Sequence, residues 1–211
     1  MIDIIAVSGI DGAGKTTACT YIYDKLILDC IVKQGNLYYY IEPSKSNAGF
    51  LALDMIRSHE YNNMELTLLL LADRLHHIDE IKKLGNNIVV ILDRFMLCTM
   101  AYQGIVQDGC KEVIYTVHQK IVDDIGKEHI HNILLDVEPI VAFNRMVSER
   151  RRLDAMETRG EEFFNKVREA YIREICNPMF QSGHIVNCNQ GLTAVKMYID
   201  DIIKDIFKVK E

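Results

Sequence analysis

Four residues near the start of the chain have the types and the spacing that hold a chain of phosphates. Gly9, Gly14, Lys15 and Thr16 fit G-x-x-x-x-G-K-[ST], between an apolar run at 4–7 and a helical pattern from about residue 15. Glycines let the backbone curl so that its N–H groups point inward, and the positive end of the helix adds to the attraction for an anion. In such loops the lysine reaches the β- and γ-phosphates and the hydroxyl holds Mg²⁺. The segment predicts a nucleoside triphosphate and Mg²⁺ site made of Gly9, Asp11, Gly12, Ala13, Gly14, Lys15, Thr16 and Thr17; a Gly-rich turn that binds nothing is the alternative.

An acidic and a basic residue follow a second apolar run, at 88–92. Asp93 and Arg94 stand just past its carboxyl end, which is where open α/β sheets bind ligands. Asp93 has the position of an acid that holds Mg²⁺ through water, and Arg94 can clamp a second phosphate with two parallel hydrogen bonds. Glu42, at the end of another strand pattern, is a weaker candidate for the metal. For the acids a helix cap or local salt bridge stays open, and for Arg94 a surface ion pair.

The elements that must position these residues alternate between strand and helix patterns. Strands are predicted at 2–7, 37–41, 88–92, 133–137 and 185–187, and helices at 15–30, 48–58, 64–83, 102–125 with a candidate break at Gly109, 139–152, 161–175 and 192–207. This order indicates a three-layer α/β fold in which helices flank a five-stranded parallel sheet. The pattern shows no repeat, linker or low-complexity tract, so residues 1–211 are predicted to form one domain.

The composition and the net charge indicate which kinds of binding partner to expect. The net charge is −6 and 49% of the residues are hydrophobic, which is ordinary globular composition without the basic face of a general nucleic-acid or membrane-surface binder. The six cysteines form no C-x-x-C pair, and no apolar run approaches the length of a membrane span. We therefore expect a cytoplasmic protein with reduced thiols and no nucleic-acid or membrane partner.

Several sequence blocks, in the right order, resemble the thymidylate kinase family of the P-loop nucleoside-monophosphate kinases. The most diagnostic block is D-R-x(7)-A-Y-Q-G, which starts at Asp93. The other blocks are GIDGAGKTT (9–17), EP (42–43), LLADRLHH (70–77), LLDVEP (134–139), LDAME (153–157), EEFFNKVREAY (161–171) and IVNCNQGL (185–192). The resemblance implies transfer of the ATP γ-phosphoryl group to dTMP, with Mg²⁺, in a homodimer.

The resemblance also assigns roles to residues on the acceptor side. It implies that Asp11 lies near the 3′-hydroxyl and the metal, and that Tyr102 and Gln103 lie beside the deoxyribose and the thymine. The substrate-binding set that it implies is Asp11, Glu42, Arg57, Leu70, Arg74, Arg94, Thr99, Tyr102 and Gln103. A solvated helix face for Arg57 and Arg74, and a core aromatic role for Tyr102, remain alternatives.

An arginine-rich segment is predicted to form a mobile lid at about 148–160. Arg150, Arg151 and Arg152 are poor core residues, and in a lid they would neutralise the transferring phosphoryl group. Some family members carry an arginine at the position of Gly12 and others supply it from the lid, so this chain resembles the lid-arginine type. The predicted catalytic set is Lys15, Arg94, Arg150, Arg151, Arg152 and Asp11; a solvated helix end is the alternative for the arginine triplet.

The chain departs from the family pattern at a few positions. The usual E-P-G-G-T stretch continues here as Ser44, Lys45 and Ser46, the phenylalanine that stacks on thymine is Leu70, and an expected glutamine is His76. The arginine of the lid motif D-R-x-E is also absent, since LDAME stands there. These departures suggest a divergent, viral-type member of the family with looser base selectivity. A P-loop kinase for another deoxynucleotide or deoxynucleoside, and an ATP-binding regulatory protein, are the rival functions.

Overall fold

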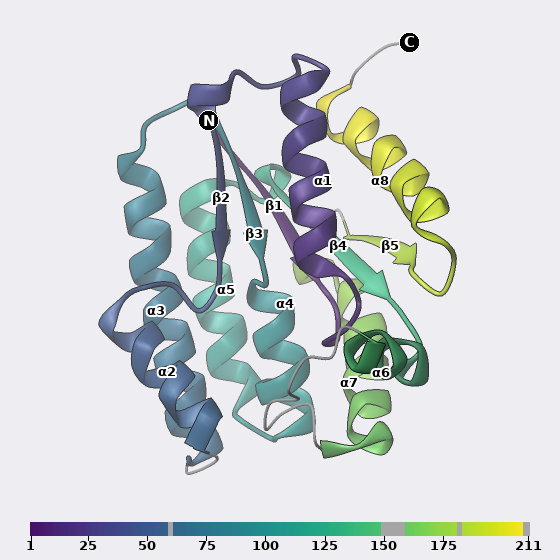
Figure 1. Ribbon diagram of the computed structural model, residues 1–211. Coiled ribbons are helices and arrows are strands. Elements are labelled where there is room, and N and C mark those ends of the chain that lie inside the picture. The colour runs from purple at the N-terminus through teal and green to yellow at the C-terminus, as the bar shows by residue number, and fades with distance from the viewer. Residues whose placement is uncertain (59–60, 149–158, 181–182, 209–211) are drawn as a thin grey trace.

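The computed structural model describes residues 1–58, 61–148, 159–180 and 183–208 (Figure 1). Within these residues, five strands form one parallel sheet in the order β2-β3-β1-β4-β5. The strands are β1 (Ile2–Ser8), β2 (Leu37–Ile41), β3 (Ile88–Asp93), β4 (Ile130–Asp136) and β5 (Gly183–Asn187). The five-stranded parallel sheet predicted from the alternating pattern is confirmed.

Helices cover both faces of this sheet, as the prediction of three layers requires. In Figure 1, α1 and α8 lie on one face, and α4, α5 and α7 lie on the other. The helices are α1 (Lys15–Leu28), α2 (Asn47–Ser58), α3 (Asn63–Lys83), α4 (Met96–Thr99), α5 (Lys111–Ile125), α6 (Pro139–Ser148), α7 (Glu161–Ile175) and α8 (Leu192–Phe207), with 3₁₀ turns at Gln34–Asn36, Lys127–His129 and Pro178–Phe180. Because β1 and its neighbour β3 are covered on both faces, their sequences are almost continuously apolar.

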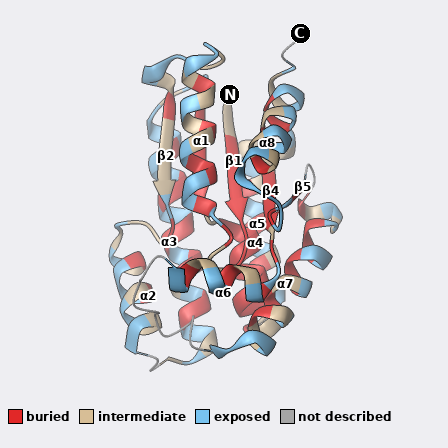
Figure 2. Cartoon of the chain, turned by 45° about the vertical axis from the view of Figure 1, so that its right-hand side comes forward, coloured by how far each residue is buried: buried red, intermediate tan, exposed pale blue. Residues whose placement is uncertain are grey.

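The core lies along β1 and β3 and under the inner sides of the helices. Figure 2 shows β1 buried over most of its length, whereas the outward sides of α1 and α8 are exposed. A smaller apolar cluster, Ala52, Leu66 and Leu70, joins α2 to α3. The register sets Val7 beside Asp93 and Ser8 beside Leu134, so the loop after β1 opens next to the ends of β3 and β4.

The chain differs from the sequence prediction after β3. A helix was expected at 102–125, but helical turns begin at Met96, in α4, and continue as a π-helical turn at Met100–Val106. The break near Gly109 is real: α5 starts only at Lys111, and the Gly109 N–H donates to the Gln103 carbonyl at 2.6 Å. Residues 95–104 are buried all round, so their apolar pattern carries no helical period. The π-helical register turns Tyr102 and Gln103 inward.

Two strands are longer than their apolar runs predict. β4 begins at Ile130, and β5 begins at Gly183. The polar residues His131, Asn132 and His184 lie inside these strands, where backbone pairing with the neighbouring strand overrides the side-chain pattern. Among the described residues, no helix combines the length and the apolarity that crossing a membrane requires.

Candidate active site

The loop between β1 and α1 has a backbone that only glycine adopts easily. Gly12 has φ +78°, and a Cβ atom there would lie 2.5 Å from the Ala142 carbonyl oxygen of α6. At Gly9, with φ +151°, a Cβ atom would lie 2.7 Å from the Leu135 carbonyl oxygen. Gly9 and Gly12 are therefore required by close packing of the loop against β4 and α6, whereas Gly14 is required only by its positive φ of +91°.

Lys15 is folded back into this loop. Its Nζ atom donates to the Ile10 carbonyl oxygen at 2.9 Å and lies 3.5 Å from Asp11 Oδ1. Burial lowers the pKa of Lys15, and the nearby charge of Arg94 acts in the same direction, while Asp11 opposes them. The ammonium thus sits on the inner side of the loop, beside the loop's single carboxylate.

Thr16 and Asp93, the predicted metal pair, are brought together. The Thr16 hydroxyl donates to Asp93 Oδ2 at 2.7 Å, and the Tyr39 hydroxyl lies 3.5 Å from the same oxygen. A hydroxyl and a carboxylate are the hard oxygen donors that Mg²⁺ takes. In the described part of the chain, no group of three or more His, Cys, Asp or Glu side chains could hold a metal by itself. The donor set therefore fits an ion that completes its shell with water and phosphate oxygens.

Asp11 lies at the centre of a charged cluster. One oxygen of its carboxylate accepts a hydrogen bond from the Arg94 guanidinium, and the other oxygen is 3.4 Å from the Tyr102 hydroxyl. Burial alone would raise the pKa of Asp11, but the charges of Arg94 and Lys15 outweigh it and hold the pKa well below its usual range. Burial and the Asp11 charge together raise the pKa of Tyr102 well above its usual value. Asp11 is thus ionised and Tyr102 neutral at neutral pH.

Arg94 is held in an unusual backbone conformation at the end of β3, with φ +76°. Burial would lower the pKa of Arg94, but the Asp11 carboxylate raises it well above its usual value. The ion pair that the sequence left open for this residue is present, and its partner lies inside the phosphate-binding loop. Strained non-glycine backbone of this kind gathers at functional sites.

Arg74 and Glu42 form a second buried group. The Arg74 guanidinium donates from Nε to Glu42 Oε2 at 2.7 Å and from Nη1 to the Thr99 hydroxyl at 2.8 Å. The other Glu42 oxygen lies 3.1 Å from His77 Nδ1. Glu42 therefore adopts the salt bridge that the sequence left as an alternative to metal binding, because Arg74 and His77 of α3 both lie beside it.

The remaining predicted acceptor residues occupy different surroundings. Leu70 packs in the cluster between α2 and α3, and Gln103 is buried in the π-helical turn. Arg57 is exposed in the last turn of α2, which agrees with its solvated-face alternative. Arg150, Arg151 and Arg152, the arginines of the predicted lid, lie outside the described residues.

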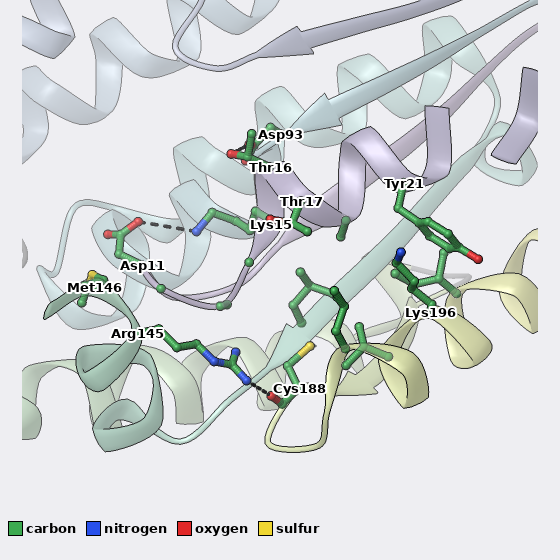
Figure 3. A pocket seen from close by; sticks show the side chains of 18 of the residues that line it. Asp11, Lys15, Thr16, Thr17, Tyr21, Asp93, Arg145, Met146, Cys188 and Lys196 are labelled. Atoms are coloured by element: carbon green, nitrogen blue, oxygen red, sulfur yellow. Dashed lines mark hydrogen bonds and ion pairs between the residues drawn. The ribbon is translucent and has the colours of Figure 1, made fainter. Parts of the chain in front are cut away.

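A cavity of about 760 Å³ opens beside the loop and extends toward α8. Its walls include the loop from Asp11 to Thr17, the strand-end pair Asp93 and Arg94, and residues of α6 and α8. Figure 3 shows Lys15 directed toward Asp11 near one end, and Tyr21 and Lys196 near the other. Arg145 closes the floor by donating to the Cys188 carbonyl oxygen at 2.6 Å (Figure 3). The cavity therefore runs from the phosphate-binding loop to the side chains of Tyr21 and Lys196.

Sequence reasoning did not single out two of these residues. His77 follows Arg74 by three positions, so helical spacing places both on one face of α3. Arg145 is the basic residue in the last turn of the otherwise apolar α6. Neither signal is specific by itself, since helical spacing places many residue pairs on one face and a basic residue near a helix end is common.

A phosphate-binding loop between a central parallel strand and a helix, with a strand-end carboxylate beside its threonine, defines a P-loop nucleotide-binding protein. Comparison with known proteins is more specific. The family model described as thymidylate kinase matches residues 7–199. The chain therefore belongs to the thymidylate kinase family, and it is an enzyme of the nucleoside-monophosphate kinase class.

Individual relatives agree with this assignment. The chain is 31% identical to a thymidylate kinase of Coprothermobacter proteolyticus over 79% of its own length and 82% of that protein. It is 28% identical to one of Legionella pneumophila, over 97% of this chain and 95% of that protein. A third, from Mycoplasmoides gallisepticum, is 26% identical over 94% and 92%. The resemblance seen in the sequence blocks is confirmed, whereas the roles it implies for single residues stay predictions.

Proposed function

We propose that this protein transfers the γ-phosphoryl group of ATP to dTMP, giving ADP and dTDP. The observation that supports this most is the contact of Asp11 with both Lys15 and Arg94. Lys15 belongs to the loop for the donor triphosphate, whereas Arg94 ends the strand beside it. The two cations thus share one oxygen, Asp11 Oδ1, and we place the meeting point of a donor and an acceptor phosphate beside it.

The proposed reaction needs positioning and neutralisation of charge more than a base. An ionised oxygen of the dTMP phosphate attacks the γ-phosphorus, the bond to the β–γ bridging oxygen breaks, and its electrons leave with ADP. Lys15 would stabilise charge on the β- and γ-phosphates, and Arg94 would hold the acceptor phosphate after exchanging Asp11 for it. A positioned nucleophile that is already charged explains why no Ser–His or Cys–His pair is required.

Thr16 and Asp93 would hold Mg²⁺. Bound there, the ion would neutralise negative charge on the phosphates during transfer. The 2.7 Å hydrogen bond between these two side chains already aligns their oxygens on the cavity side of β3. Asp11 would assist from the loop, near the acceptor 3′-hydroxyl.

The acceptor nucleoside would lie along the buried polar groups beyond Arg94. We assign Arg74, Thr99, Tyr102 and Gln103 to its sugar and base, with Glu42 holding Arg74 in place. Arg57 would approach the acceptor phosphate from α2. Leu70 would replace an aromatic ring against the thymine, which weakens selection for that base.

The lid arginines Arg150, Arg151 and Arg152 would supply further positive charge during transfer. Support comes from Gly12, because its backbone touches α6 and leaves no room for an arginine at that loop position. In keeping with the family resemblance, we also propose a cytoplasmic homodimer that acts on small molecules and has neither a nucleic-acid nor a membrane partner.

A panel of acceptors tests the proposal. Formation of ADP from ATP is measured with dTMP, dUMP, dGMP or thymidine in turn, with and without Mg²⁺. We expect the highest kcat/KM with dTMP, reduced but measurable turnover with dUMP, and loss of activity without the metal. Turnover with thymidine alone, or hydrolysis of ATP that no acceptor stimulates, would contradict the assignment.

A further inference from the structure

Arg159 joins three separate elements on the acceptor side of the molecule. It precedes Gly160, the N-cap residue of α7. Its guanidinium lies 4.9 Å from the centre of the Phe163 ring and donates from Nη2 to the Tyr61 hydroxyl at 2.5 Å. Tyr61 lies in the connection between α2 and α3, so this one side chain links that connection to α7.

The third partner is Gln107, directly after the π-helical turn. With its side-chain oxygen turned toward the guanidinium, the Gln107 amide accepts from Arg159 Nη1 at 2.5 Å. The Gln107 carbonyl oxygen also accepts from Asn63 Nδ2 at 2.7 Å. A planar guanidinium with donors in fixed directions suits such a junction, and a lysine could not bridge it in the same way.

Each partner of Arg159 touches a residue assigned to the acceptor nucleoside. Tyr61 packs against the cluster that contains Leu70. The Gln107 backbone N–H donates to the Tyr102 carbonyl oxygen at 3.0 Å, and the ring centres of Phe163 and Tyr102 are 6.1 Å apart. We call Leu70 with its cluster the Leu70 wall of the proposed acceptor site, and Tyr102 the Tyr102 wall. Arg159 touches neither wall directly, but each of its partners touches one of them.

We propose that Arg159 is a positioning residue for the acceptor nucleotide. It holds the Leu70 wall and the Tyr102 wall at a fixed separation, through Tyr61 on one side and Gln107 and Phe163 on the other. Since the nucleoside-facing wall at Leu70 lacks an aromatic ring, a fixed separation offers another way to select a flat base. The inference rests on the acceptor placement under Proposed function.

Steady-state kinetics of Arg159→Ala and Tyr61→Phe test this role. We expect each change to raise the KM for dTMP about tenfold while the KM for ATP stays within about twofold, because the donor loop makes none of the contacts named here. Tyr61→Phe keeps the ring and removes the hydroxyl, so it addresses the junction even where Arg159→Ala lowers stability. The double variant should be no worse than the more impaired single variant, since both remove the same contact.

Matched variants separate this role from a structural one. Arg173→Ala removes an arginine of α7 whose side chain is 64% exposed, and it should leave both KM values unchanged. Arg159→Lys keeps the charge and should recover the melting temperature without recovering the KM for dTMP. Equal changes in both KM values, an unchanged KM for dTMP, or additive effects in the double variant would overturn the proposal. Arg94→Ala, measured alongside, tests the acceptor placement itself, because it acts through the phosphate whether or not Arg159 matters.

Discussion

At the scale of single residues, Lys15 is the group on which turnover should depend most. It lies inside the loop, where its ammonium faces the carbonyl of Ile10 and the carboxylate of Asp11. Lys15→Ala should lower kcat by about 10²–10³-fold, since it removes a preorganised charge from the transferring phosphoryl group. A circular dichroism spectrum and melting curve like those of the unchanged protein would show that the fold persists. A kcat near that of the unchanged protein would reject the role.

Gly12 gives a prediction about stability. Gly12→Ala sets a Cβ atom against the Ala142 carbonyl oxygen at a positive φ, so it should destabilise the protein by about 1–3 kcal/mol. Gly35→Ala is the matched control, because a Cβ atom there meets nothing within 4 Å and φ is not positive. Urea unfolding measures both changes. Equal stability of the two variants would show that the loop can move away from α6.

The Asp11 carboxylate should make stability depend on pH in acid. Its pKa in the folded chain lies below its usual value, so the ionised form contributes stability above about pH 4, and this is lost as the pH falls through the folded pKa. Asp11→Asn should therefore flatten the loss of unfolding free energy between about pH 5 and 3. Asp54→Asn, at an exposed position of α2, serves as the control. Identical slopes in the unchanged protein and Asp11→Asn would contradict the prediction.

At the scale of elements, α3 supplies Leu70 and Arg74 to the proposed acceptor site, and its first turn is capped by side chains. The Asn62 side chain accepts from the Met64 N–H at 2.8 Å, and Glu65 reaches back to the Asn62 N–H at 3.4 Å, which forms a capping box. Asn62→Ala should cost about 1 kcal/mol of unfolding free energy, and Asn62→Asp should retain the cap. Denaturant titration compares the two, and a stable Asn62→Ala would mean that packing alone holds this end.

The π-helical turn is the element that the apolar pattern failed to predict. Helical period appears in a sequence only where one side of the helix meets water, and Met100–Gly104 meets none. The same burial is what places Tyr102 beside Asp11 and Tyr171. The π-helical turn, whose sequence pattern does not predict its structure, thus supplies a side chain that contacts Asp11 in the proposed site.

At the scale of the whole molecule, exposed apolar side chains on α3 bear on assembly. Leu68 is 49% exposed and Leu75 is 38% exposed, and their spacing of seven residues places them on one side of the helix. If the proposed homodimer forms there, Leu68→Asp with Leu75→Asp should halve the mass seen by sedimentation, toward the 24.3 kDa of one chain. Met197→Asp changes an exposed side chain of α8 and should leave the mass unchanged. A single-chain mass for the unchanged protein would reject the homodimer.

The sequence by itself determined the parts whose chemistry is local. The phosphate-binding loop is a contiguous run from Gly9 to Thr17, so its spacing alone defines the backbone it needs. Alternating strand and helix patterns likewise determined the parallel sheet, because covering both faces demands apolar strands and amphipathic helices. The sequence blocks that identify the family are also contiguous, so the family could be recognised without knowledge of any contact in space.

Tertiary structure alone decided which charges meet. Glu42 and Arg74 are 32 positions apart, and Asp11 and Arg94 are 83 apart, so no local pattern pairs them. Two further contacts join segments that are distant in the sequence. Gly12 meets Ala142 of α6, and Arg159 meets Tyr61, so both depend on how the elements pack together. The physical reason is that pairing of buried charges follows distance through space, whereas spacing along the chain encodes only neighbours on one strand, loop or helix.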